Sequence, residues 1–336
     1  MFSSLTFQKR LFVTVVLSGS IFLFFAFLYT LQHRSQLAEE IMQERSSTLQ
    51  IILNERIKSK EEFGLGLAVM LANNPLIKDY LSKGLRDDAL SLVEEIIANY
   101  AATTNYRGLK VQIHTAQGKS WMRSWNPTHF GDDLQSRPSI KKIMQERIPF
   151  SSSTEIGLVG FAIRGIAPIF IDNKYLGSLE VLQGVGSVSR DFESDKQVYI
   201  LLLNNKLIKE SPSIEKNIAI NNYFLPNDKW FNKRAIDFAK LVESKKTNSD
   251  LSKASLNINE KWFYIKIPIL NSNGDLIGLH LVGEPEAGVN KQISTALSSA
   301  WVFMLIIAFL IIGMGVWLLG KYNAELFVPL QNFKKN

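Results

Sequence analysis

Two long stretches without a charged residue constrain the fold of this chain more than any other feature. Residues 11–31 read LFVTVVLSGSIFLFFAFLYTL, and residues 292–320 contain the almost wholly apolar run WVFMLIIAFLIIGMGVWLL. A helix rises about 1.5 Å per residue, so about 20 apolar residues cross the hydrocarbon core of a bilayer. Because these stretches flank most of the polar residues, we expect two transmembrane helices rather than two buried core helices.

A secretory signal peptide is the alternative interpretation of the first stretch. Its apolar run is longer than the ~7–15 residues of a usual signal core. The residues that follow, Gln32, His33 and Arg34, do not form a small-residue cleavage pattern. We therefore interpret the stretch as an uncleaved membrane anchor.

The cations beside the two stretches predict their orientation. Lys9 and Arg10 precede the first, whereas Lys321, Lys334 and Lys335 follow the second. The positive-inside rule then places both termini in the cytoplasm of a bacterial cell with the membrane spans in its inner membrane. The residues between the spans would be exported to the periplasm.

Composition limits the classes of molecule that the exported region is expected to bind. The net charge of +7 raises the possibility of nucleic-acid binding, but no basic stripe with interleaved aromatic residues is present, so we expect no nucleic acid as partner. The chain has no cysteine, so its exported part is held by core burial rather than by disulfides.

The pattern after the first span is helical. Residues 35–72 carry an apolar stripe that predicts a long stalk helix ending before Pro75, with a face for a homodimer. A second helix is expected over 87–100. The stripe consists of Leu37, Ile41, Leu49, Ile52, Leu53 and Ile57.

The pattern then changes to strands. Alternating apolar and polar residues predict strands at 109–113 and 120–125, a short helix at 138–146, and strands at 161–171 and 175–184.

An internal repeat indicates two modules. PIFIDNKYLGSLEVL begins at Pro168 and PILNSNGDLIGLHLV at Pro268, with Gly177 matching Gly278. The preceding VQIHTAQGKSWMR and VYILLLNNKLIKE each read as strand, turn and strand. Two tandem α+β modules follow from this repeat, with 214–252 as a helix and loops inside the second; chance similarity of two hairpins is the alternative.

The chain also resembles a known family, the double Cache sensor domains of bacterial transmembrane receptors. LKVQIHTAQGKSWMRSWNPTHFGDDLQSRPSI, EIGLVGFAIRGIAPIF and YLGSLEVLQG carry the resemblance, which covers 35–285 and is strongest at 109–183. They are similar to a subgroup with an Arg-x-Trp-x-Pro strand end, a Gly-Asp-Asp-Leu turn and a downstream Arg. The amino-acid-binding pattern of related double Cache domains is not evident, which leaves the ligand class open. The FVPL sequence at 327–330 resembles the beginning of a HAMP linker.

The resemblance implies an α+β fold: a long N-terminal stalk helix and two tandem PAS-like antiparallel-sheet modules, flanked by two transmembrane helices. The expected segments are a cytoplasmic N-terminus (1–10), a first transmembrane helix (11–31), a stalk and helical segment (32–104), a membrane-distal module (105–192), a membrane-proximal module (193–288), a second transmembrane helix (293–320) and the start of HAMP (321–336).

Arg123 is the first candidate ligand-binding residue. Strand alternation predicts that Trp121, Arg123 and Trp125 share one face, where a guanidinium between two indoles would bind a carboxylate. The alternative is a structural arginine stacked on tryptophan and paired with Asp132 or Asp133. These two aspartates could instead bind a ligand ammonium or cap a turn.

Arg137 and Arg164 complete the candidate set. Arg137 opens the short helix and Arg164 lies on a central strand. A buried arginine needs an anionic partner, because an unpaired buried charge is very costly. That partner is either the ligand or a carboxylate of the chain, which could be Glu155, Glu180 or an aspartate.

No catalytic motif is evident. The four histidines are scattered and no metal-ligand spacing occurs, and the Gly184-Val185-Gly186 run lacks the third glycine of a nucleotide site. We therefore expect no enzyme, metal or cofactor in the chain as given.

The leading interpretation is a transmembrane receptor. It would bind a small organic acid or an amino-acid-like compound outside the cell and relay the signal through the second span and HAMP, as a methyl-accepting chemotaxis receptor. The alternative is the sensor region of a histidine kinase or a diguanylate cyclase, which residues after Asn336 would decide. A structural or adhesive membrane protein is a third possibility.

Overall fold

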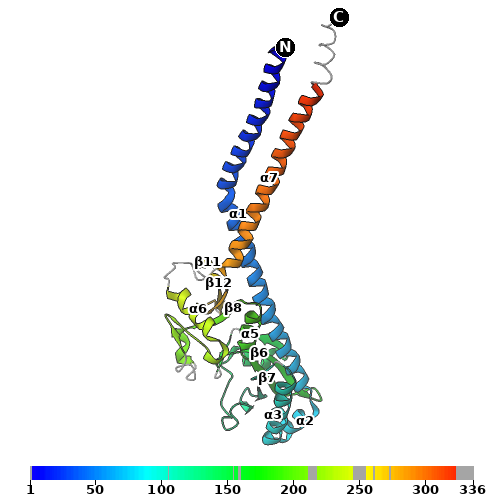
Figure 1. The fold of residues 1–336 in the computed structure, drawn as a ribbon. Helices are drawn as coiled ribbons and strands as arrows, with labels where there is room; N and C mark the ends of the chain where they lie inside the picture. Colours follow the sequence, from blue (N-terminus) through cyan, green and yellow to red (C-terminus); the bar gives the residue numbers. More distant parts are fainter. Residues whose placement is uncertain are drawn as a thin grey trace. The chain divides into compact units, whose positions relative to one another are not determined.

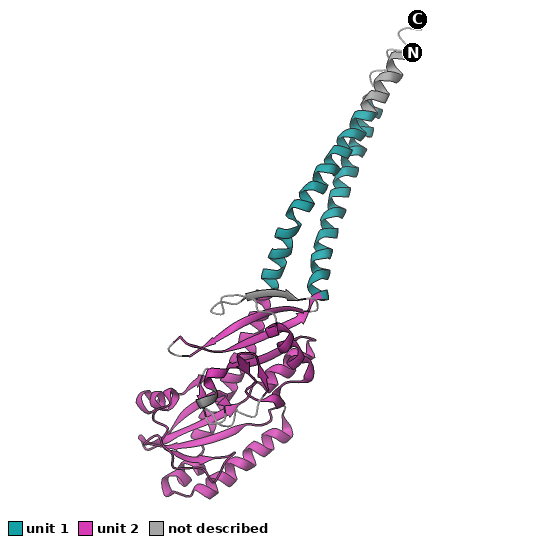
Figure 2. Ribbon diagram, turned by 90° about the vertical axis from the view of Figure 1, so that its left-hand side faces the viewer, with its two compact units in different colours: residues 1–45, 287–336 teal, residues 46–286 magenta. Residues whose placement is uncertain are grey.

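The computed structural model describes residues 2–104, 106–153, 155–157, 160–210, 218–244, 255–259, 262–271 and 274–322. The chain forms two compact units, one of residues 1–45 and 287–336 and the other of residues 46–286 (Figure 2). The HAMP prediction at 327–330 falls outside the described residues.

The first unit is a pair of helices that lie side by side and run in opposite directions (Figure 1). They are the N-terminal part of α1 (Phe2–Ala72) and α7 (Glu286–Tyr322). The rings of Phe27 and Trp301 are 5.8 Å apart between centroids. A Cβ added to Gly315 would lie 2.5 Å from Val15 Cγ1, so the absence of a side chain there permits the close approach of the two helices.

Most of the apolar surface of this unit is exposed. The apolar windows of α1 and α7 have mean hydropathies of 2.0 and 2.6, and only 11% and 6% of them are buried. Phe309 is 82% exposed and Phe303 65%. A core helix of a water-soluble domain would cover such side chains, so both helices are long and apolar enough to cross a membrane.

The second unit begins with a five-stranded antiparallel sheet in the order β2-β1-β7-β6-β3. Its register gives the sheet two distinct faces. The helix face, which carries Val111, Ile113 and Val181, packs against α1, α2 and α3, and the loop face, which carries Gln112 and Glu180, is covered by α4. The elements are β1 (Lys110–Thr115), β2 (Ser120–Arg123), β3 (Phe150–Ser152), β6 (Ile163–Ile171), β7 (Lys174–Gln183), the small pair β4 (Ile156–Gly157) and β5 (Gly160–Phe161), α2 (Pro75–Lys83), α3 (Arg86–Thr103) and α4 (Pro138–Glu146).

A six-stranded sheet follows in the order β11-β12-β13-β8-β10-β9. The hairpins β6–β7 and β12–β13, which carry the sequence repeat, occupy corresponding central places in the two sheets, and the predicted α+β fold with two antiparallel-sheet modules is confirmed. The elements are α5 (Gly186–Ser194), β8 (Val198–Asn204), η1 (Asn205–Glu210), β9 (Ala219–Ile220), β10 (Tyr223–Phe224), η3 (Asp228–Trp230), α6 (Lys233–Ser244), β11 (Ser255–Asn259), β12 (Trp262–Leu270) and β13 (Leu276–Pro285).

Two expectations drawn from the sequence are wrong in detail. The predicted strand after the turn at Asn204 is the 3₁₀ helix η1, because β13 and β10 already pair with the two edges of β8. The stalk stripe is not wholly free for a homodimer, because Leu49 and Leu53 are completely buried within the chain itself.

Helix α1 approaches strand β6 at a pair of glycines. A Cβ added to Gly165 would lie 2.1 Å from the carbonyl carbon of Gly64 and 2.2 Å from the nitrogen of Leu65. These atoms are backbone and cannot rotate away, so any side chain at position 165 would push the helix off the sheet. The absence of a side chain at this point therefore determines how deeply α1 packs.

We expect Gly165→Ala to destabilise the sensory unit by about 1–3 kcal/mol or more, because the added methyl group overpacks this contact. Gly66→Ala is the matched control: no atom lies within 4 Å of its added Cβ, and alanine in a helix is favoured over glycine by about 0.5–1 kcal/mol. Thermal unfolding of the full chain in detergent measures both. Equal melting temperatures for the two variants would contradict the role of this contact.

Candidate functional site

A β-bulge at Trp121 separates the residues that the sequence placed on one face. In the pairing of β1 with β2, Ile113 faces Met122 and His114 faces Ser120, which leaves Trp121 as the extra residue. Trp121 consequently packs against the core cluster on the helix face, whereas Arg123, opposite Gln112, points to the loop face. The prediction that Trp121 and Arg123 share a face is therefore wrong, because the bulge breaks the two-residue period.

Arg123 is almost completely buried and is paired within the chain. Its guanidinium donates to both carboxylate oxygens of Asp132, at 2.7 and 2.6 Å, and to the carbonyl oxygen of His129 at 2.8 Å. These hydrogen bonds, which outweigh the opposing effect of burial, lower the pKa of Asp132. The bidentate pair ties β2 to the loop that follows it, which corresponds to the structural alternative considered for Arg123.

The other two predicted residues of this loop take separate places. Asp133 Oδ1 accepts a hydrogen bond from the backbone nitrogen of Gln135 at 2.9 Å, which is the turn-capping role. Trp125 lies beyond the end of β2, and the Lys110 ammonium is 5.7 Å from its ring centroid. The structure therefore brings neither residue into the cluster around Arg137 and Arg164.

Arg137 and Arg164 meet at a buried carboxylate on the loop face. Arg164 donates to Glu180 at 2.8 Å and to the carbonyl oxygen of Glu155 at 2.7 Å. Arg137 donates to the Glu155 carboxylate at 2.8 Å and to Glu180 at 3.2 Å. Burial by itself would raise the pKa of Glu180, but the two guanidiniums together with His114 hold that pKa well below its usual range. Sequence reasoning named both carboxylates as possible partners of a buried arginine.

His114 is the member of this cluster that the sequence did not single out. Its Nδ1 lies 3.0 Å from Ser178 Oγ, and its Nε2 lies 3.6 Å from Glu180 Oε2. Complete burial lowers the pKa of His114, so the ring is neutral at neutral pH. Its position two residues from Gln112, in alternation with Ile113, is the sequence signal that could have placed it on the loop face.

Several buried polar atoms of this loop-face cluster lack a hydrogen-bond partner among the described residues. They are Arg164 Nε, Glu180 Oε2, His114 Nε2 and Ser139 Oγ. A buried polar group without a partner costs about 1–3 kcal/mol, and two of these atoms, His114 Nε2 and Glu180 Oε2, face each other at 3.6 Å. The described residues include no group of His, Cys, Asp and Glu side chains that could hold a metal ion.

We expect Glu180→Gln to destabilise the chain by about 3–5 kcal/mol, because it leaves the buried Arg164 without its charged partner. Asp79→Asn is the control: Asp79 pairs with Lys83 at 2.8 Å, but both side chains are largely exposed, so less than about 1 kcal/mol should be lost. Thermal or denaturant unfolding of the two variants compares them. A Glu180→Gln chain as stable as the control would show that the cluster does not stabilise the fold.

Comparisons with known proteins identify the family to which this chain is similar. A family model described as the double sensory domain of two-component sensor kinase matches residues 43–287. No curated protein matches the chain.

Several solved structures are similar to part of this chain. A domain described as sensory box/GGDEF family from Vibrio parahaemolyticus is 14% identical, with 77% of this chain and 99% of that chain covered and a TM-score of 0.43. The ligand-binding domain of the Campylobacter jejuni chemoreceptor Tlp3, in complex with 4-methylisoleucine, is 16% identical over 76% and 94%, with a TM-score of 0.39. That of the Pseudomonas fluorescens chemoreceptor CtaA, in complex with L-isoleucine, is 11% identical over 77% and 98%, with a TM-score of 0.41.

The family match extends from the stalk part of α1 to the first residues of α7 and includes both sheets. The resemblance to double Cache sensors, inferred over residues 35–285 and strongest at 109–183, is thereby confirmed. The chain belongs to the double Cache family described as the double sensory domain of two-component sensor kinase.

Proposed function

We propose that the chain is the sensing and membrane-spanning part of a receptor that binds a small ligand outside the cell and relays the binding event across the inner membrane. One observation carries this proposal: α1 and α7, which bound the double sensory domain, each hold an exposed apolar window long enough to span a bilayer. An adhesive or purely structural protein would have no need for a sensory domain continuous with both helices.

The relay would run through α7. Strand β13 ends at Pro285 and α7 begins at Glu286, so no flexible linker separates the second sheet from the helix. A stiff helix transmits a small axial or rotational shift, and shifts of about 1–2 Å are typical of helix switches. A second copy of the chain would give this shift a fixed reference, and the exposed Ile51 on the stalk of α1 is available for that contact.

In our leading proposal, the protein is a methyl-accepting chemotaxis receptor. The support is the resemblance of residues 327–330 to the start of a HAMP linker directly after the second apolar helix. A histidine kinase or a diguanylate cyclase is the second candidate, favoured by the description of the matching family as part of two-component sensor kinases.

The ligand site of the first module lies, in this proposal, on the loop face. Arg164 Nε can donate to a ligand carboxylate, and Glu180 Oε2 can accept from an ammonium group, which favours an amino-acid-like compound or an organic acid. Arg137 belongs to the same cluster, while Arg123, Asp132, Asp133 and Trp125 would frame the loop that covers it. Ligand entry requires a movement of the segment that carries α4.

A cysteine-labelling experiment tests the topology. The chain contains no cysteine, so Lys119→Cys introduces a single thiol at an exposed position in the first module. In intact cells a membrane-impermeant maleimide that crosses the outer membrane should label this thiol. A cysteine added after Asn336 should react only after the inner membrane is permeabilised. The opposite labelling pattern would refute the receptor proposal.

The loop-face site predicts a specific effect of Ser139→Ala. Ser139 Oγ has no described partner, so its removal should leave the melting temperature of the free chain unchanged or slightly raised. It should, however, weaken the stabilisation given by an amino-acid or organic-acid ligand, which acts by mass action. A thermal-shift screen of the full chain with L-amino acids, succinate and malate finds the ligand.

Ser189→Ala is the matched control, because Ser189 is also a buried serine but lies on α5 and donates to the carbonyl oxygen of Tyr199 at 3.3 Å. Its ligand shift should equal that of the unmodified chain. A ligand shift that Ser139→Ala does not change would count against the loop face as the binding site.

A further inference from the structure

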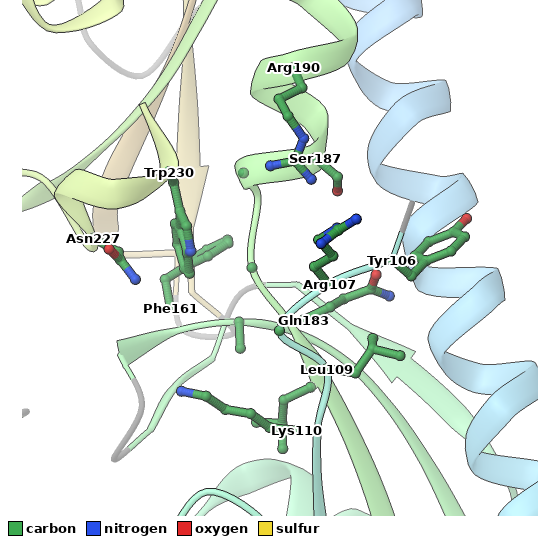
Figure 3. A pocket seen from close by; sticks show the side chains of 15 residues that line it. Tyr106, Arg107, Leu109, Lys110, Phe161, Gln183, Ser187, Arg190, Asn227 and Trp230 are labelled. Carbon is green, nitrogen blue, oxygen red and sulfur yellow. The ribbon is translucent and has the colours of Figure 1, made fainter. Parts of the chain in front are cut away.

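A cavity lies within the sensory unit, away from the loop-face cluster and at the junction of the two modules. It has a volume of about 230 Å³. The ends of β1 and β7 line it on one side, and the beginning of α5 together with η3 lines it on the other (Figure 3). None of the candidate ligand residues from the sequence is among those that line it.

The cavity is strongly basic. Arg107 and Arg190 extend toward the same space from opposite walls, and Lys110 lies below them (Figure 3). Neither guanidinium makes a hydrogen bond or ion pair with any described residue, unlike Arg123, Arg137 and Arg164. No carboxylate of the described residues lines this cavity.

One carboxylate lies close by. Asp191 lines an adjoining hollow together with Lys60, Arg107 and Arg190. Burial lowers the pKa of Lys60, and the opposing effect of the Asp191 carboxylate is smaller. Burial also lowers the pKa of Lys110. The aspartate is therefore outnumbered, and the region retains a net positive charge that a bound anion would offset.

The first turn of α5 adds donors to the same space. The helix begins at Gly186, and its N-cap residue, Val185, supplies no side-chain hydrogen bond to the first turn. Gly186 and Ser187 both line the cavity. Uncapped backbone N–H groups at a helix N-terminus attract anions, so they act in the same direction as the two arginines.

A flat apolar wall stands opposite the cations. A Cβ added to Gly184 would lie 2.2 Å from Cζ2 of Trp230, and one added to Gly186 would lie 3.1 Å from Cδ1 of the same indole. The two glycines thus allow Trp230 to lie directly against the strand end, beside Phe161 (Figure 3). Aromatic rings stack on an indole of this kind.

We propose that this junction cavity is a second ligand site, which binds a small aromatic carboxylate. The carboxylate group lies between Arg107 and Arg190 at the N-terminus of α5, and the ring lies along Trp230. The cavity has the volume of about eight water molecules at ~30 Å³ each, which suits a molecule of the size of benzoate. Guanidinium groups bind carboxylates in a bidentate manner, and this geometry explains the two unpaired arginines.

The site has a consequence for signalling. Arg107 precedes β1 of the first sheet and Lys110 is the first residue of that strand. Trp230 belongs to η3, which lies between β10 and α6 of the second module. A ligand held by both groups bridges the two modules. The binding free energy of this ligand therefore depends on the relative position of the two modules. A bound ligand stabilises the arrangement in which the two walls of the cavity are separated by the width of the ligand.

Isothermal titration of the full chain in detergent with sodium benzoate, at physiological ionic strength, tests the proposal. We expect saturable binding that weakens at least tenfold in Arg107→Ala and in Arg190→Ala, because each variant removes a charged hydrogen bond to the carboxylate. Both side chains are exposed, so the fold should persist. Trp230→Ala should weaken benzoate binding more than malonate binding, because only benzoate has a ring to stack.

Arg147→Ala is the matched control for the loss of one positive charge. Arg147 is exposed, lies over the Tyr175 ring and lines neither the cavity nor the adjoining hollow, so benzoate should bind this variant normally. Absence of saturable benzoate binding, or equal affinities in the Arg107, Arg190 and Arg147 variants, would overturn the proposal. Ser139→Ala should leave benzoate binding unchanged, which separates this site from the loop-face site.

Discussion

The contact of Gly165 with the backbone of α1 is the constraint on which the sensory unit depends. Helix α1 has 71 residues, and the apolar side chains near its N-terminal end are exposed. Because of this contact, its C-terminal end forms one wall of a buried core. The helix face of the first sheet can then exclude water around Leu71, Val93 and Ile113. Once α1 occupies this face, polar groups of the sheet can collect only on the other face, under α4.

The division of the first sheet into an apolar and a polar face explains its chemistry. Two arginines, two glutamates and a histidine on or beside the loop face satisfy most of one another's charges, which removes much of the cost of burying them. The remaining unpaired polar atoms require a guest, a water molecule or a ligand.

The junction between the modules follows a different principle. There the two arginines are exposed and make no ion pair with a described residue, and the aromatic wall packs against two residues without side chains. A site of this kind costs little stability when empty, since the arginines remain hydrated. It gains electrostatic attraction when an anion excludes that water. The two proposed sites therefore differ in the physical basis of ligand attraction.

The sequence by itself determined the elements whose signals are local. Charge-free runs predicted the two apolar helices, the end of α1 before Pro75 followed from the restricted backbone of proline, and the repeated hairpins indicated two antiparallel-sheet modules. The need of a buried arginine for an anion also pointed correctly to Glu180 as a partner of Arg164 and to Glu155 as a partner of Arg137, because a buried charge without a partner is very costly.

Only the tertiary structure decided what depends on register and on contacts distant in sequence. The bulge at Trp121 moved that ring to the opposite face from Arg123, and strict alternation could not reveal it because one inserted residue reverses the period. The pairing of Arg123 with Asp132 depended on how the intervening loop folds back. The junction cavity joins Arg107 of the α3–β1 connection, Arg190 of α5 and Trp230 of η3. No spacing in the chain could indicate that these residues meet, because their proximity exists only after both modules have folded.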